Sequence, residues 1–286
     1  MTSRNKGIFS LEFLLPNVGF LLIAALAVFA FYHYIVTPRA KELMIERSVK
    51  ASSGKFASAG PEERSVFLVI KDREPMFEII FCTWGLITLA YKFLQISREK
   101  KLLKQDFLHV QPGERIIPED AFDRYKDLRS AIDRDPKWQD RLLPDCVLAA
   151  LHRFHATASI QDASNAVKER AEIAADHLDS SLSLVRYIVW AIPAIGFVGT
   201  VRGIGEALSF AEQAIKGDIS SLTANLGLAF NSTFVGLMLC ILLMFVLHVV
   251  QSQQESFIIE TQTYCRDKLI DVMKVPTRDE TAGLLA

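Results

Sequence analysis

Four long apolar blocks constrain this chain of 286 residues more than any other feature of its sequence. They lie near residues 14–36, 76–96, 184–201 and 226–250. Each block is about 18–25 residues long, which is enough for a helix to cross a hydrocarbon core of roughly 30 Å. The blocks therefore predict an all-α, polytopic membrane protein with four transmembrane helices.

Charge and cysteine usage exclude two common classes of function. The formal net charge is -1, whereas a protein that binds nucleic acid normally presents a basic surface. The four cysteines follow no short repeated spacing, which indicates neither a disulfide framework nor a zinc site. We expect no metal site, no cofactor and no nucleic-acid partner.

The first block differs from a cleaved signal peptide, although Arg4 and Lys6 precede it. Its apolar run is longer than the usual core of about 7–15 residues, and no clear small-residue cleavage site follows. We therefore expect this block to remain as the first span.

The distribution of Lys and Arg predicts the orientation. Four spans place both termini on one side together with the loop 97–183, and this side carries twenty Lys and Arg against nine on the other. The positive-inside rule then places the termini and this loop in the cytoplasm. The sequence divides into an N-terminal hairpin (1–96) with an extracytoplasmic loop (37–75), a cytoplasmic helical region (97–183), a pair of channel-forming helices (184–250) and a cytoplasmic C-terminal helix (251–286).

The cytoplasmic segments are predicted to be helical. Pro118 followed by acids is a good helix start, and Ser159 with Asp162 has the spacing of a capping box. No helix breaker lies between Ser159 and Pro193, so we expect one helix to run from the cytoplasm into the third span. The fourth span is expected to continue to Pro276. Helices of about 50 residues would reach roughly 75 Å, well beyond the bilayer.

Small residues and one hydroxyl share a face on each of the last two spans. In the third span, the residues within a sector of about 80° are Pro193, Gly196, Thr200, Gly203 and Ala207. In the fourth span, the corresponding residues are Ala229, Thr233, Gly236 and Cys240. Such stripes are common helix-packing surfaces in membranes, and this interpretation stands beside a functional one.

The two segments "AIPAIGFVGTVRGIGEAL" and "LGLAFNSTFVGLMLCI" resemble the signature helices of the MotA/TolQ/ExbB proton-channel superfamily. The resemblance covers roughly residues 160–272, and the first half is similar to MotA only in its four-span topology. It implies a homopentamer around a dimer of an ExbD/TolR/MotB-like single-span protein, whose helix carries an aspartate. H⁺ or Na⁺ would pass between pentamer and partner in a bacterial inner membrane.

The resemblance also implies roles for individual residues. Thr200 and Thr233 match pore-lining threonines, and their hydroxyls would hydrate the partner's aspartate. The remaining residues assigned to the ion pathway are Pro193, Gly196, Gly203, Ala229, Gly236 and Ser232. ExbB-like members carry a glutamate where this chain has Leu228, and Asn231 and Ser232 are candidates to substitute for it in part.

Arg202 and Glu206 are not part of the family motif. They are four residues apart and can pair on one helix, with Arg202 about 160° around the helix from Thr200. One interpretation is a pair at the outer membrane boundary. The other is an inter-subunit gate that closes the outer end of the pathway.

The sequence thus predicts the channel-forming subunit of an ion-driven rotary stator and no enzymatic activity. A structural membrane scaffold and a secondary transporter are the alternatives, although a transporter usually shows duplicated halves and broken helices. The driven process is open among import, envelope maintenance, motility and defence.

Overall fold

The structure is a computed structural model that describes residues 11–52, 65–104, 108, 114–135, 137–217 and 219–275. Its helices are α1 (Leu11–Phe31), η1 (Tyr32–Val36), α2 (Thr37–Ser52), α3 (Val66–Val69), α4 (Arg73–Leu103), α5 (Pro118–Arg134), α6 (Leu142–Thr157), α7 (Ile160–Ser180), α8 (Ser183–Leu208), α9 (Ala211–Ile215), α10 (Ser220–Lys268) and η3 (Ile270–Val272). Among the described residues, the only β-type pairing is an isolated bridge between Ile116 and Met273.

Four helical segments are long and apolar enough to cross a membrane, which confirms the all-α polytopic class. They cover Leu15–Glu46, Arg73–Leu103, Ile160–Leu208 and Asn225–Val272. Most of the side chains in these spans are not buried inside the chain. Apolar surface of this extent is what lipid or neighbouring subunits cover in a membrane protein.

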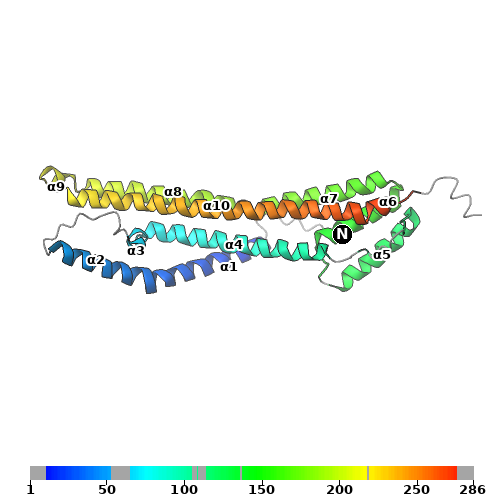
Figure 1. Cartoon of the computed structure of the whole chain (residues 1–286), viewed down its shortest axis with the longest axis horizontal. Helices are drawn as coiled ribbons and strands as arrows, with labels where there is room; N and C mark the ends of the chain where they lie inside the picture. Colours follow the sequence, from blue (N-terminus) through cyan, green and yellow to red (C-terminus); the bar gives the residue numbers. More distant parts are fainter. Residues whose placement is uncertain are drawn as a thin grey trace, which may run out of the picture. The chain divides into compact units, whose positions relative to one another are not determined.

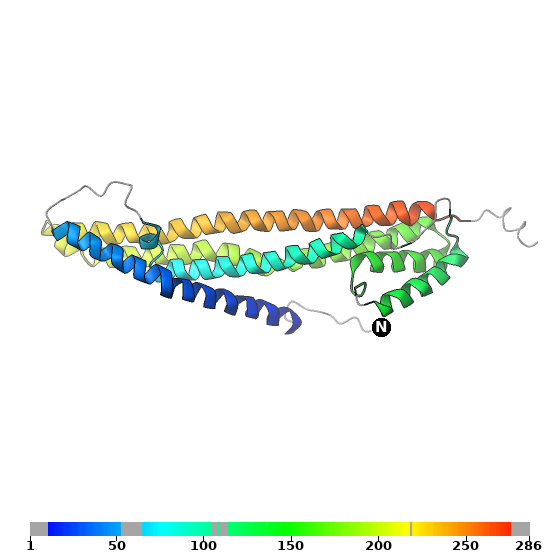
Figure 2. The same cartoon turned by 60° about the horizontal axis from the view of Figure 1, so that its bottom comes forward.

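The chain divides into two compact units. The first comprises Met1–Tyr91 and Ser183–His248, and the second comprises Lys92–Leu182 and Val249–Ala286. The long helix α10 contributes residues to both units and is a single ribbon in Figure 2.

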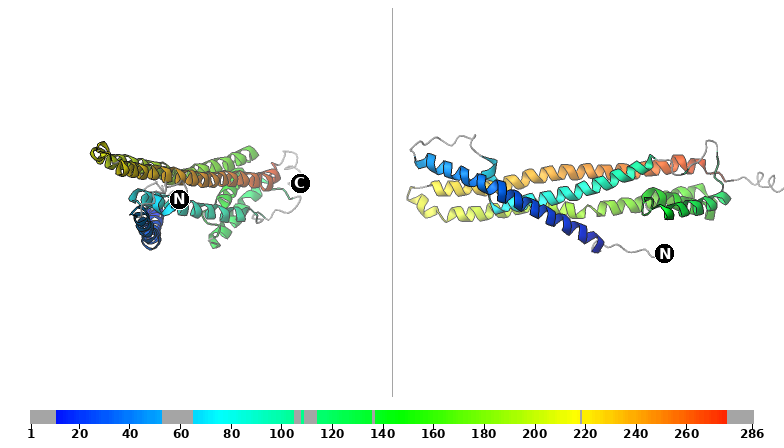
Figure 3. Two further views of the ribbon diagram at one scale, coloured as in Figure 1. Left: turned by 60° about the vertical axis from the view of Figure 1, so that its left-hand side comes forward. Right: turned by 90° about the horizontal axis from the view of Figure 1, so that it is seen from below.

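The first span continues as helix into the segment that the sequence analysis treated as a connecting loop. Figure 3 shows α1, η1 and α2 as one ribbon. The backbone N–H of Thr37 bonds to the carbonyl of Tyr32, a π-type step immediately before Pro38. Proline lacks an N–H and crowds the preceding turn, and a widened turn accommodates it without ending the helix. The expected loop 37–75 therefore begins as a helix, and its residues 53–64 lie outside the described residues.

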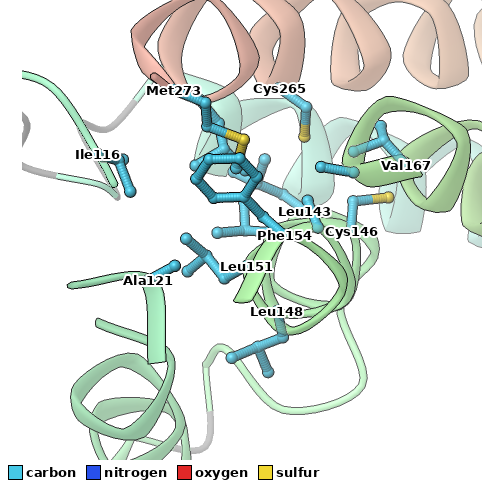
Figure 4. Packing of buried hydrophobic residues seen from close by; sticks show 14 of the residues in the cluster. Ile116, Ala121, Leu143, Cys146, Leu148, Leu151, Phe154, Val167, Cys265 and Met273 are labelled. Carbon is cyan, nitrogen blue, oxygen red and sulfur yellow. The ribbon is translucent and has the colours of Figure 1, made fainter. Parts of the chain in front are cut away.

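The second unit has its own hydrophobic core, which is centred on α6. Phe154, Leu151 and Cys146 of this helix are at most 1% exposed. Figure 4 shows them packed with Cys265 and Met273. The Ile116 N–H donates to the carbonyl of Val272 at 3.0 Å, which ties the start of α5 to the end of the chain's described part. This core holds the C-terminal part of α10 in place within its unit.

Two helix starts predicted from the sequence are confirmed. α5 begins at Pro118, and Ser159 is the N-cap of α7, with its hydroxyl accepting the Asp162 N–H at 3.2 Å. The continuous helix expected from Ser159 into the third span is wrong in one detail, since it is interrupted at Ser181 and Leu182. The hydroxyl of Ser181 donates to the carbonyl of Leu178 at 2.7 Å, and such local bonds compete with the helical ladder.

Candidate functional site at the α8–α10 helix pair

The small-residue face of α8 is buried within the first unit. Gly196, Gly199, Thr200, Gly203 and Ala207 are all buried, whereas Pro193 on the same face is partly exposed. Exposed apolar side chains cover the opposite side of this helix; they include Phe197, Val198 and Val201. The face predicted from the helical period is therefore real, and it points inward in this chain.

The neighbouring helix α10 supplies the matching surface. Ala229, Ser232 and Gly236 are buried, and Thr233 is partly buried beside them. Figure 1 shows α8 and the first part of α10 running side by side. The stripe on one helix is thus covered by the stripe on the other, which is the packing arrangement that small residues permit in membranes.

Close backbone approach explains why glycine is needed on α8. A Cβ placed on Gly203 would lie 2.6 Å from Cβ of Ala229, and a Cβ on Gly199 would lie 2.6 Å from Oγ of Ser232. Both separations are far inside van der Waals contact. Any larger residue at these positions would push the two helices apart.

A pair of threonine hydroxyls joins the two helices at the middle of this contact. The two Oγ1 atoms of Thr200 and Thr233 are 2.5 Å apart. Thr200 donates to the carbonyl of Ala229 at 2.9 Å, and Thr233 lies 3.0 Å from the carbonyl of Gly196, to which it can donate. Each hydroxyl is therefore within reach of both the opposing backbone and the other hydroxyl.

A third helix, α4, brings a carboxyl group to the same place. Glu78 is 0% exposed, and neither of its carboxyl oxygens has a hydrogen-bond partner among the described residues. A Cβ on Gly196 would lie 2.9 Å from Oε1 of Glu78, and a Cβ on Gly236 would lie 3.3 Å from it. The carboxyl group therefore sits over two glycines, one from α8 and one from α10.

Glu78 is the residue that the sequence analysis missed. Its signal was present, because a lone acid at the edge of the apolar block 76–96 is a functional candidate by default. An ionised side chain near the bilayer centre costs roughly 2.5–3.5 kcal/mol on insertion scales. A chain that keeps such a group in a span must either stabilise it or use it.

Charged groups gather at the start of α4. Arg202 on α8 donates to Glu74 at 2.9 Å and lies 3.7 Å from Glu206. The side chain of Glu74 is only 14% exposed, whereas that of Glu206 is 57% exposed. Burial, with the nearby carboxylates Glu74 and Glu206, raises the pKa of Asp72, which precedes α4. The pairing of Arg202 with Glu206 expected from their spacing is present, but the shorter contact of Arg202 is with α4.

The segment from just before α6 to near the end of α10 matches a known family model. The match covers residues 139–263 and includes both helices of the threonine pair. Residues 139–263 match the MotA/TolQ/ExbB proton channel family. The family assignment made from the two signature helices is confirmed. No curated protein and no solved structure was found to match the chain.

The matched family is one of membrane channels and not of enzymes, and the four apolar helices agree with a multi-pass membrane protein. The predicted pathway residues are brought together by the fold: Thr200, Thr233, Gly196, Gly203, Ala229, Ser232 and Gly236 all lie at the α8–α10 contact. Their role in ion conduction stays a prediction. The side chain of Leu228, at the position expected to differ from ExbB-like members, lies outside the described side chains.

Proposed function

We propose that this chain is the channel-forming subunit of a stator complex driven by an ion gradient. In this proposal it forms a homopentamer around a dimer of an ExbD/TolR/MotB-like partner with one Asp-bearing span. The complex lies in a bacterial inner membrane with both termini of this chain in the cytoplasm. It conducts H⁺, or alternatively Na⁺, along the subunit–partner boundary and converts the flow into mechanical work.

One observation carries the proposal: a proton channel family match whose signature helices are joined through the Thr200–Thr233 hydroxyl pair. The hydroxyls lie in a segment lined mainly by glycine and alanine, so together with Ser232 and Glu78 they are polar groups that an ion following this contact would meet. The outward apolar faces also support an assembly. On α10 these include Phe234, Leu237 and Ile241, each at least 49% exposed.

Ion flow through a hydroxyl-lined path is tested with Thr233→Val. This change keeps the shape of the side chain and removes its hydroxyl, so the complex should assemble normally and lose at least nine-tenths of its ion flux. The assay is dye-detected H⁺ or Na⁺ uptake into liposomes that contain the complex purified from its native cells, together with a mass measurement in detergent. Five copies of this chain per complex are expected, and a monomer or a lone dimer would contradict the proposed assembly.

Thr88→Val is the matched control. Thr88 lies in α4, is 3% exposed and donates within its own helix to the carbonyl of Trp84 at 2.9 Å. The control therefore removes a buried hydroxyl from the same unit without touching the α8–α10 contact. We expect it to conduct like the wild type.

A structural scaffold remains a second candidate because one observation favours it. Thr200 and Thr233 lie within hydrogen-bond distance of backbone carbonyls across the helix contact, which is what a pure packing role requires. The scaffold role predicts that the wild-type complex passes no ions and that Thr233→Val changes only its stability. Wild-type ion flux in Thr233→Val would show that the two threonines only pack the helices and do not take part in conduction.

A further inference from the structure

We propose that Glu78 is a proton-binding site of this chain, whose carboxyl group takes up and releases a proton during ion conduction. The chain then carries a protonatable group of its own in addition to any aspartate of a partner. The consequence for flux rests on the proposed function, whereas proton binding by Glu78 does not.

The first argument is the position of the carboxyl group between α8 and α10. Glu78 is fully buried, and its Oε1 lies where a Cβ on Gly196 or Gly236 would be 2.9 Å or 3.3 Å away. A side chain at either position would crowd the carboxyl group, and glycine at both leaves it in place. The two small stripes therefore pack the helices and at the same time shape a cradle for one polar side chain.

The second argument is the absence of a counter-charge facing Glu78 among the described residues. The titratable groups near it are Glu74 and, one turn further along α4, Cys82, together with Tyr32 on η1. The hydroxyl of Tyr32 does not donate to Glu78, because it donates to the carbonyl of Ile70 at 2.7 Å. Arg202, one of the cations at this end of α4 together with Lys71 and Arg73, contacts Glu74 at 2.9 Å instead. A carboxyl group buried without a cation is more stable with its proton than without it.

The third argument is that the site is connected on two sides. Glu74 lies one helical turn before Glu78 on the same face of α4 and is 14% exposed, so it links Glu78 toward the charged end of the helix. On the other side, a Cβ on Gly196 would be 3.0 Å from Cα of Thr233 and 2.9 Å from Oε1 of Glu78. The carboxyl group and the threonine pair therefore meet at the same glycine.

The occupant is a proton and not a metal cation. Hard metal cations take several oxygen ligands at once. Here the cradle holds a single carboxyl group pressed against two glycines, and even a methyl group added to either glycine would contact it. A proton needs no such shell, since binding it converts the carboxylate to a neutral carboxyl group and releasing it reverses the step.

Proton binding is tested on the full-length chain in lipid by infrared difference spectroscopy across a pH change. The wild type is expected to show a carbonyl-stretching band of a protonated carboxyl group that diminishes as the pH is raised. Glu78→Gln should lack this band. Glu172→Gln is the control for the chemical change, because Glu172 is a 63% exposed residue of α7. Identical titrating bands in Glu78→Gln and the wild type would overturn the proposal.

Participation in conduction is tested on the native complex in liposomes. Glu78→Gln is expected to reduce proton uptake at least tenfold with an unchanged mass of the complex. Glu78→Asp keeps a titratable group and is expected to keep the infrared band and at least a tenth of the flux. An equal loss in both variants would indicate packing and overturn the proposal, as would wild-type flux in Glu78→Gln. If the wild-type complex itself passes no protons, the proposed function fails, and the infrared titration still decides whether Glu78 binds a proton.

Discussion

The close contact between α8 and α10 predicts opposite outcomes for two glycine-to-alanine changes on the same helix. Gly203 faces Ala229, whose Cβ would lie 2.6 Å from an added methyl group and whose Cα would lie 2.9 Å from it. Gly205, two residues later, would place a methyl group with nothing within 4 Å. The two changes are chemically identical and differ only in what the new methyl group meets.

The magnitude follows from two opposing effects. Alanine is preferred over glycine inside a helix by about 1 kcal/mol, and this gain applies to both positions. At Gly203 the methyl group overlaps backbone and a Cβ that has no rotamer to change, so the helices must separate, at a cost of about 1–3 kcal/mol typical of overpacking. The helix-propensity gain cancels in the comparison, and Gly203→Ala should be about 1–3 kcal/mol less stable than Gly205→Ala.

The assay is the unfolding of the two full-length variants and the wild type in the same lipid nanodiscs, followed by circular dichroism as denaturant is added. Gly205→Ala should match or slightly exceed the wild type, and Gly203→Ala should unfold first. Equal stability of the two variants would refute the close contact between Gly203 and Ala229.

Two further predictions concern polar contacts. Ser159→Ala removes the N-cap of α7 and should lower the stability of the second unit by about 1 kcal/mol, measured by the same unfolding assay with Ser130→Ala, an exposed residue of α5, as its control. For Arg202→Glu, the loss of function should be rescued better by adding Glu74→Arg than by adding Glu206→Arg, since Arg202 is 2.9 Å from Glu74 and 3.7 Å from Glu206. The exposed Arg202–Glu206 contact should contribute only about 0.2–1 kcal/mol. Equal rescue by both second changes, measured as ion flux, would show that the contact with α4 is not the important one.

The spans and their small-residue faces could be predicted because both depend on local patterns. Length and hydropathy identify a span without knowledge of its neighbours, and the helical period places Thr200 and Gly203 on one face. The starts at Pro118 and Ser159 were predictable for the same reason, since a cap is defined by residues within one turn.

What covers the small face could not be predicted from the same pattern. The stripe on α8 fits a partner's helix and a neighbouring helix of the same chain equally well, because glycine and alanine have no group that selects a partner. In this chain α10 covers it, with Ala229 against Gly203 and Ser232 against Gly199. The helical continuation through η1 was also missed, because Pro38 normally marks a boundary and only the π-type turn before it keeps the helix unbroken.

Glu78 shows how an acid that faces another helix can be recognised from the sequence of its own span. This chain has Leu228 where ExbB-like members carry a glutamate, and the sequence comparison of the fourth span alone then suggests that a carboxyl group is missing. On α4, however, Glu78 shares one face with Cys82, Gly85 and Leu89, all of them buried. An acid on the lipid-facing side of a span can be solvated only by extending to water at the membrane surface. An acid on the same helix face as buried small residues faces another helix instead. Whether a lone acid shares a helix face with buried small residues therefore tells an acid that faces another helix from one that faces lipid. Glu78 does share such a face, and it lies against Gly196 and Gly236, the glycines beside the threonine pair.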